Sequence, residues 1–221
     1  MNKLDLLFIV DITASMGSLI RDAQTRMKDM LSELSNSHDL DLKVGLSLYR
    51  DHASQRDPFV TITFDLMDND KIQDVIDKIE VGGGGDFPEA VVDGIIEGTK
   101  AMSWREGSRR IAFLIGDAPA HGMYMDEPCC QCGNTWGDAV VSAEECEAVV
   151  YSILLGRDSQ ASDNFRTLAN YTGGFLIETD NAMDAIVRTL KDVMSEESIE
   201  SKVLSEMSQT ENVEDLLKVC R

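Results

Sequence analysis

Basic residues are scarce in this chain. Only 20 lysines and arginines stand against 40 aspartates and glutamates, giving a formal net charge of −20 over 221 residues. Because phosphate backbones and anionic lipids attract basic surfaces, this deficit argues against binding to nucleic acid or to an anionic membrane surface. The composition is still that of a folded protein, since 43% of the residues are hydrophobic.

Long apolar segments are also absent. No run approaches the roughly 20 residues that a membrane-spanning helix needs. The apolar stretch at residues 6–10 is too short for a secretory signal and leads directly into a polar motif. Taken as given, the sequence is therefore expected to be cytoplasmic, unless it is a piece of a longer protein. The five cysteines are odd in number and do not resemble an extracellular disulfide framework.

Apolar runs alternate with helical patterns along most of the sequence. We predict an α/β fold: a doubly wound, mainly parallel six-stranded sheet with one short antiparallel edge strand, helices on both faces and a Rossmann-like arrangement. Residues 1–194 should form this domain, and residues 195–221 an acidic tail or appended helix. The expected strands are residues 4–10, 42–48, 60–64, 111–115, 149–155 and 174–177. The expected helices cover residues 19–34, 72–79, 86–102, 162–171 and 181–194.

A run of oxygen-bearing side chains follows the first predicted strand. Asp11, Thr13 and Ser15 lie at positions i, i+2 and i+4 of one turn. Hard cations such as Mg²⁺ prefer six oxygen ligands, several of them often water. One carboxylate and two hydroxyls make only a partial shell, which leaves coordination positions open for another molecule.

Two further acidic residues stand where this fold would bring them close to Asp11. Asp117 follows the apolar strand 111–115, and Asp86 follows four glycines at the expected start of a helix. Each could instead be a helix cap or turn residue. The glycines do not form a phosphate-binding P-loop, because no Lys-Ser or Lys-Thr pair follows them.

Together these motifs resemble the von Willebrand factor type A (VWA) domains and their metal-ion-dependent adhesion site. Asp11-Ile12-Thr13-Ala14-Ser15 resembles the family motif D-x-S-x-S, with Thr in place of the first Ser, and Asp117 matches the family's late aspartate. The run GGGGDFPEA and the tracts YRDH and DAPAHG are similar to the branch with hemicentin-like and alpha-kinase-associated domains. The resemblance covers roughly residues 4–194.

The resemblance implies a metal site made by Asp11, Thr13, Ser15, Asp86 and Asp117. Mg²⁺ is the expected ion, with Ca²⁺ and Mn²⁺ as alternatives. In the family, an acidic side chain of a protein partner completes the shell of the metal. Here Asp86 stands where the best-known members have a threonine, and this extra carboxylate would weaken the attraction for an acidic partner. A basic partner side chain therefore stays an alternative, as does a role for Asp86 as a helix cap.

Cysteines gather between residues 117 and 149. Cys129 and Cys132 have the C-x-x-C spacing of half a zinc site, which Cys130, Cys146 or His121 could complete. Because a second paired spacing is absent, free thiols are the favoured alternative, with a disulfide also open. His121 is expected to be a turn or packing residue rather than a catalytic base.

The sequence contains no nucleophile elbow, no catalytic Cys-His signature and no set of kinase motifs. We therefore expect an interaction module that recruits a protein partner at a metal ion, and not an enzyme. Two alternatives remain: a metal-assisted hydrolase that uses the acidic edge, and a scaffold whose metal is purely structural.

Overall fold

The computed structural model describes residues 2–38, 40–52, 59–84, 87–123 and 129–195. The chain divides into two compact units, residues 1–185 and 186–221. The first unit contains the whole sheet. Residues 182–195 are helical, and residues 186–195 are the described part of the second unit. The predicted tail, residues 196–221, lies outside the described residues, so the expected domain boundary at residue 194 stays a prediction.

The sheet has six strands in the order β3-β2-β1-β4-β5-β6. All neighbouring strands are parallel except β2 and β3, which pair antiparallel at the edge. The predicted fold class is therefore confirmed. The strands are β1 (Asn2–Asp11), β2 (Leu40–Tyr49), β3 (Thr61–Met67), β4 (Arg109–Gly116), β5 (Val149–Leu155) and β6 (Leu176–Thr179).

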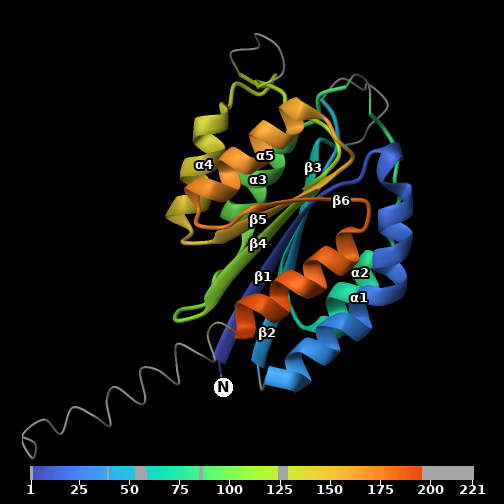
Figure 1. Ribbon diagram of the computed structural model, residues 1–221, viewed down its shortest axis with the longest axis vertical. Coiled ribbons are helices and arrows are strands. Elements are labelled where there is room, and N and C mark those ends of the chain that lie inside the picture. Colours follow the sequence, from blue (N-terminus) through green and yellow to red (C-terminus); the bar gives the residue numbers. More distant parts are fainter. Residues whose placement is uncertain (1, 39, 53–58, 85–86, 124–128, 196–221) are drawn as a thin grey trace, which may run out of the picture. The chain divides into compact units, whose positions relative to one another are not determined.

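Helices cover both faces of this sheet (Figure 1). On one face lie α1 (Gly17–His38), which a short 3₁₀ turn (Ala14–Met16) precedes, and α2 (Asn69–Ile76). On the other face lie α3 (Val91–Ala101), α4 (Trp136–Glu145) and α5 (Ser159–Tyr171). Within the described part of the chain, no helix has the length and apolarity needed to cross a bilayer.

Two helices differ from the sequence-based expectation. Helix α3 begins at Val91 rather than near Pro88, because Glu89 pairs with Ala120 in an isolated parallel β-bridge before the helix starts. Helix α4 was not expected at all. Its start is a capping box, in which Thr135 and Asp138 bond each other's backbone N–H groups, and this spacing was readable in the sequence.

The core explains why β1 is nearly continuous in apolar residues. Leu6, Leu7, Phe8 and Ile9 are all wholly buried, as expected for a central strand covered on both faces. On the α3 side, glycine allows close packing: a Cβ at Gly94 would lie only 2.6 Å from Cδ1 of Tyr49. Tyr49, at the end of β2, is thereby held tightly beneath α3.

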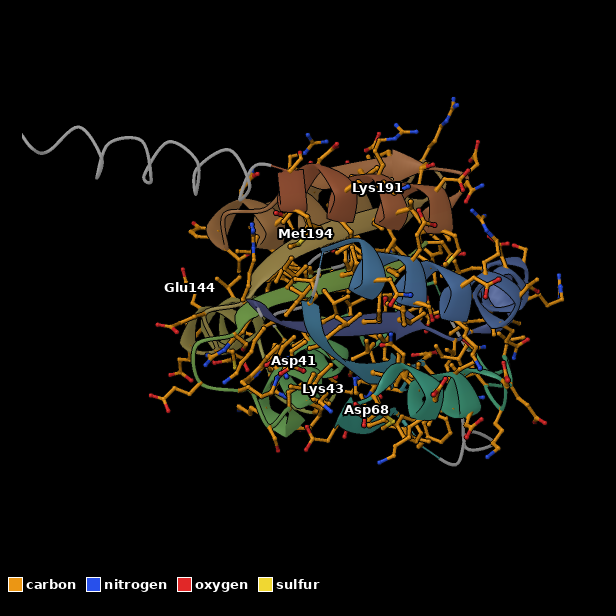
Figure 2. The ribbon with its side chains drawn as sticks, turned by 90° about the horizontal axis from the view of Figure 1, so that it is seen from below. Asp41, Lys43, Asp68, Glu144, Lys191 and Met194 are labelled. Carbon is orange, nitrogen blue, oxygen red and sulfur yellow. A yellow bond between two sulfur atoms is a disulfide. The ribbon has the colours of Figure 1, made fainter. Side chains whose placement is uncertain are left out.

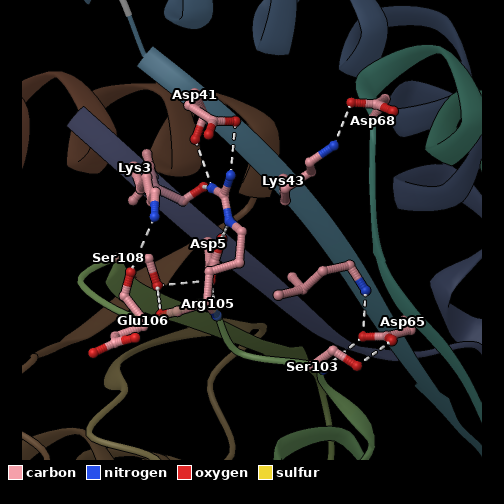
Figure 3. Close-up of polar contacts among 12 residues, drawn as sticks. Lys3, Asp5, Asp41, Lys43, Asp65, Asp68, Ser103, Arg105, Glu106 and Ser108 are labelled. Carbon is pink, nitrogen blue, oxygen red and sulfur yellow. Dashed lines mark hydrogen bonds and ion pairs between the residues drawn. The ribbon is translucent and has the colours of Figure 1, made fainter. Parts of the chain in front are cut away.

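A polar network connects the parallel strands at the end of the sheet where they begin (Figure 3). The Arg105 guanidinium donates to Oδ1 of the buried Asp5 at 2.7 Å and to the backbone oxygen of Asp41 at 2.6 Å. Ser108 Oγ donates to Asp5 Oδ2 at 2.7 Å. Nearby, Lys43 donates to Asp68 at 2.6 Å (Figure 3), and Figure 2 labels both residues on the whole molecule. These contacts tie the starts of β1, β2 and β4 together. The candidate site lies at the other end of the sheet, where β1 and β4 finish.

Candidate metal site

The candidate site lies at the carboxyl edge of the sheet, where β1 and β4 end side by side. In the parallel register Val10 pairs with Ile115, so Asp11 and Gly116 are the next residues along the two strands. A Cβ built at Gly116 would lie 3.5 Å from the Cβ of Asp11. Asp117 follows Gly116 directly. The expectation that these two strand ends bring Asp11 and Asp117 to one edge therefore agrees with the strand register.

The turn after β1 holds the Asp11 side chain through one of its two oxygens. Oδ1 of Asp11 accepts hydrogen bonds from the backbone N–H and from the hydroxyl of Thr13, both at 2.7 Å. The Thr13 hydroxyl also lies 3.2 Å from the Ser15 hydroxyl. Asp11 and Thr13 are buried, whereas Ser15 is exposed. The three oxygen-bearing side chains therefore form one connected row that leads from the interior to the surface.

The second oxygen of Asp11 is the most informative atom of the site. Oδ2 is buried and, among the described residues, has no hydrogen-bond partner. The Asp11 pKa is raised from 3.8 to about 7. Burial is the main cause, the hydrogen bonds from Thr13 act in the opposite direction, and the charges of Asp117 and Asp51 add to the rise. A buried carboxylate needs a proton or a positive charge beside it. Near neutral pH, the environment of Oδ2 therefore favours either a proton on this oxygen or a cation beside it.

A third chain segment closes over this edge. The Gly82 N–H donates to the Ile12 carbonyl at 3.0 Å, which joins the glycine run to the end of β1. Gly84 has a φ of +88°, and a Cβ there would meet Glu89 Oε1 at 3.5 Å and Thr13 Cβ at 3.6 Å. Only glycine adopts such a backbone without strain, so its presence lets the segment pass close to the site.

Glu89 is an acidic residue of this edge that the sequence reading missed. Its N–H donates to the Pro119 carbonyl at 2.9 Å, and its own carbonyl accepts from the His121 N–H at 3.0 Å. Glu89 is 5% exposed. Burial raises the pKa of Tyr49, and the charges of Asp11, Glu89 and Asp117 raise it further, which indicates that the three carboxylates lie near this phenol. The pair Pro88-Glu89 in the run GGGGDFPEA was the sequence signal that could have identified this acidic residue.

A hollow of about 290 Å³ opens at this edge. Thr13 and Ser15 line it from one side, and Asp117 and Glu89 from another. The structure thus brings together four of the five predicted ligands: Asp11, Thr13, Ser15 and Asp117. The fifth, Asp86, lies outside the described residues. The assignment of these residues as ligands stays a prediction.

Beside the hollow lies a pair of buried side chains from two other loops. His121 Nε2 is 3.0 Å from Asp51 Oδ1, and both side chains are almost fully buried. His121 therefore packs against an acid in the interior, in keeping with the expected turn or packing role.

The cysteines are arranged differently from the predicted zinc set. A disulfide joins Cys130 and Cys132, and Cys129 is free. Cys146 lies elsewhere, where its thiol donates to the Thr99 carbonyl at 3.3 Å. Of the candidate zinc ligands Cys129, Cys130, Cys132, Cys146 and His121, only Cys130 and Cys132 belong to the His, Asp and Cys cluster that the described residues form. The C-x-x-C spacing alone did not identify the pair, because the disulfide joins Cys132 to Cys130 rather than to Cys129.

Comparison with known proteins decides the family. A model of the von Willebrand factor A domain matches residues 5–181. The chain belongs to the von Willebrand factor A family. The resemblance expected from the D-x-[ST]-x-S turn and Asp117 is therefore confirmed, and the strand order is that of a VWA domain.

Individual relatives of this VWA domain cover it to different extents. The alpha-protein kinase vwkA of Dictyostelium discoideum is 34% identical over 119 residues, which is 53% of this chain but only 19% of that protein. The pilus adhesin SpaC of Lactobacillus rhamnosus GG superposes over 89% of this chain and 30% of its own, with a TM-score of 0.62 and 15% identity. Proximal thread matrix protein 1 of the mussel byssus, solved with a zinc-occupied MIDAS motif, gives a TM-score of 0.58 at 14% identity over 87% of this chain and 44% of its own. The two structural likenesses show the fold alone.

Replacing Asp11 by Asn tests the cost of burying its charge in metal-free protein. The folded-state pKa of about 7 exceeds the ordinary value of 3.8. The folded protein therefore keeps this proton to higher pH, and the contribution of Asp11 to stability falls as pH rises through that window. In chelator, we expect Asp11→Asn to be more stable than wild type at about pH 8, with the gap narrowing toward about pH 5. Urea unfolding followed by circular dichroism measures both values; a variant that is less stable than wild type at the higher pH would contradict this account.

Proposed function

We propose that this VWA domain binds a divalent cation through Asp11, Thr13, Ser15 and Asp117, and that a protein partner docks at this ion. The observation that carries the proposal is the buried Oδ2 atom of Asp11, which has no hydrogen-bond partner among the described residues. A cation at this edge would give that oxygen a partner and would offset the charges that raise the Asp11 pKa.

Mg²⁺ is the ion that we favour, because every proposed donor is a hard oxygen. Ca²⁺ and Mn²⁺ prefer oxygen as well and remain alternatives. The zinc-occupied MIDAS motif of the mussel thread protein supports divalent binding at a site of this kind, although its likeness to this chain is one of fold. With Asp11, Glu89 and Asp117 ionised, three negative charges face one divalent ion, so the loaded edge would still be negative.

Partner docking needs an ion that is not fully enclosed. Ser15 is exposed, and the hollow beside it is lined by Thr13, Asp117 and Glu89. This supports an open coordination position rather than a closed structural metal. The remaining negative charge favours a basic or neutral partner group near the ion, while the ion itself favours a partner carboxylate. Both remain open within the proposal.

A hydrolase is the weaker alternative. Metal-assisted hydrolysis needs a base that can reach a metal-bound water. The nearest histidine, His121, is buried and lies 3.0 Å from Asp51, which supports a packing role. The kinase activity in the name of vwkA belongs to a protein of which this chain matches 19%, so it is not transferred. We therefore propose that the domain is not an enzyme.

Thermal unfolding with and without Mg²⁺ tests the ion site. At about 100 times the dissociation constant, an ion stabilises by about 2.7 kcal/mol, which raises the melting temperature of a domain of this size by roughly 5–10 °C. We expect this rise in wild type and its loss in Asp11→Ala. Asp29→Ala, which removes an exposed aspartate in the middle of α1, is the matched control and should keep the rise. An equal rise in Asp11→Ala and wild type would refute the site.

Partner docking is tested at Phe87, a 48% exposed side chain that lines the hollow but offers no metal ligand. Phe87→Ala should leave the Mg²⁺-dependent melting shift unchanged and should weaken the Mg²⁺-dependent capture of proteins from cell extract, compared with capture in chelator. Phe175→Ala is the matched control, because Phe175 is also 48% exposed but lies beside Tyr151 at β6. If capture does not depend on Mg²⁺, or if both variants capture equally, docking at this edge is wrong even when the ion binds.

A further inference from the structure

We propose that His52, Asp93, Cys130 and Cys132 form a second metal site, specific for zinc, when the two cysteines are reduced. One potential ligand atom from each residue lies within 4.8 Å of the others. None of these residues belongs to the site at Asp11. This inference stands independently of the proposed function.

The four side chains match the chemistry of zinc rather than that of Mg²⁺. Zinc binds cysteine sulfur, histidine nitrogen and aspartate oxygen, and structural zinc sites have four tetrahedral ligands. With bonds of about 2.3 Å to sulfur and about 2.0 Å to nitrogen or oxygen, tetrahedral ligand atoms lie roughly 3.3–3.8 Å apart. Side-chain shifts of about 1 Å would therefore bring the observed atoms into this geometry.

Three separate segments bring these ligands together. His52 follows β2, Asp93 lies in the first turn of α3, and the two cysteines lie in the turn before α4. Helices α3 and α4 lie on the same face of the sheet (Figure 1). His52 Nε2 is 2.8 Å from Asp93 Oδ2, and Cys130 Sγ lies 3.5 Å from the same oxygen. Asp93 is therefore the centre of the cluster.

The backbone around the cysteines is shaped for this approach. Gly122 has a φ of +81°, and a Cβ there would lie 2.6 Å from the backbone nitrogen of Cys130. The Gly133 N–H donates to the Cys130 carbonyl at 2.9 Å and closes the turn that holds Cys130 and Cys132 on the same side. Asn134 Nδ2 lies 3.4 Å from the other Asp93 oxygen, where it would orient the carboxylate.

The four ligands of the cluster differ in exposure. Cys130 is 2% exposed, Asp93 is 7% exposed and the His52 side chain is 8% exposed. Cys132 is exposed to solvent. An ion could therefore reach the cluster past Cys132 and would then be bound by three nearly buried ligands.

In the structure the two sulfurs are bonded to each other, so reduction must precede zinc binding. A dithiol such as dithiothreitol transfers two electrons to this bond, forms its own cyclic disulfide and leaves two thiols on the protein. Zn²⁺ then displaces the two thiol protons and binds the thiolates. Because the disulfide spans residues only two positions apart, it restricts the unfolded chain little, and its loss should cost little stability.

Zinc here would connect the segment between β4 and α4 to both α3 and the end of β2. The His52 ring stands edge-on to the His121 ring at 5.6 Å, and His121 in turn contacts Asp51. The zinc site would therefore stabilise the side of the domain next to the Asp11 edge.

The experiment is metal binding to the full chain, purified with dithiothreitol. Zinc content is measured by elemental analysis, and Co²⁺ is then used as a spectroscopic substitute. We expect one zinc per chain, and with Co²⁺ a thiolate charge-transfer band together with the visible bands of a tetrahedral site. Cys132→Ser removes the exposed ligand itself. Losing a contact that only supports a ligand typically weakens metal binding about 10- to 100-fold, so this variant should weaken zinc binding by more than that.

Three controls separate this site from other sources of zinc. Cys129→Ser and Cys146→Ser each remove one of the two free thiols among the described residues, and both variants should bind zinc as wild type does. Asp11→Ala should also keep it, which excludes zinc at the predicted Mg²⁺ edge. The proposal is overturned if the reduced protein holds no zinc, if Cys132→Ser keeps full affinity, or if the Co²⁺ complex lacks the thiolate band. It is equally overturned if Asp11→Ala abolishes zinc binding.

Discussion

The buried carboxylate at the end of the central strand is the constraint on which the rest of this edge depends. Asp11 directly follows the buried apolar run of residues 6–10 in β1, so its side chain starts inside the protein rather than at the surface. Thr13 satisfies one oxygen, and the nearby acids make an unshared charge on the other oxygen costly. Either a proton or a cation must therefore accompany folding at neutral pH.

The surrounding fold keeps this carboxylate in place. The glycine run closes over the edge, because Gly82 bonds the turn after β1 and Gly84 passes near Thr13 without a side chain. Gly116 allows β4 to end beside Asp11 and the Tyr49 hydroxyl, where a Cβ would lie 2.5 Å from that oxygen. Close packing at these glycines thus brings the acidic side chains together at this edge. The high overall negative charge of the chain further favours the binding of cations.

Features coded locally could be predicted from the sequence. The apolar runs predicted the strands, and the row Asp11, Thr13, Ser15 was readable because one turn contains all three residues. Asp117 could be placed because parallel strands end at a common edge. These inferences needed only the period of the pattern and the order of the strands.

Features that depend on distant segments could not be predicted in this way. Pro88 has the local chemistry of a helix start, yet the chain first pairs Glu89 with Ala120, a contact between residues 31 positions apart. The cysteines were given partners by spacing, whereas the structure brings His52 and Asp93 to them from β2 and α3. Helix α4 is the exception, because Thr135 and Asp138 encode its capping box locally.

The most direct test of the central claim is a crystal structure of the protein grown with Mn²⁺, using the anomalous signal of the metal to locate it. The account predicts an anomalous peak at the carboxyl edge, within bonding distance of an Asp11 oxygen and of the Ser15 hydroxyl, with Asp117 bonded directly or through water. A well-ordered, metal-free edge in which a protein side chain donates a hydrogen bond to Asp11 Oδ2 would contradict it.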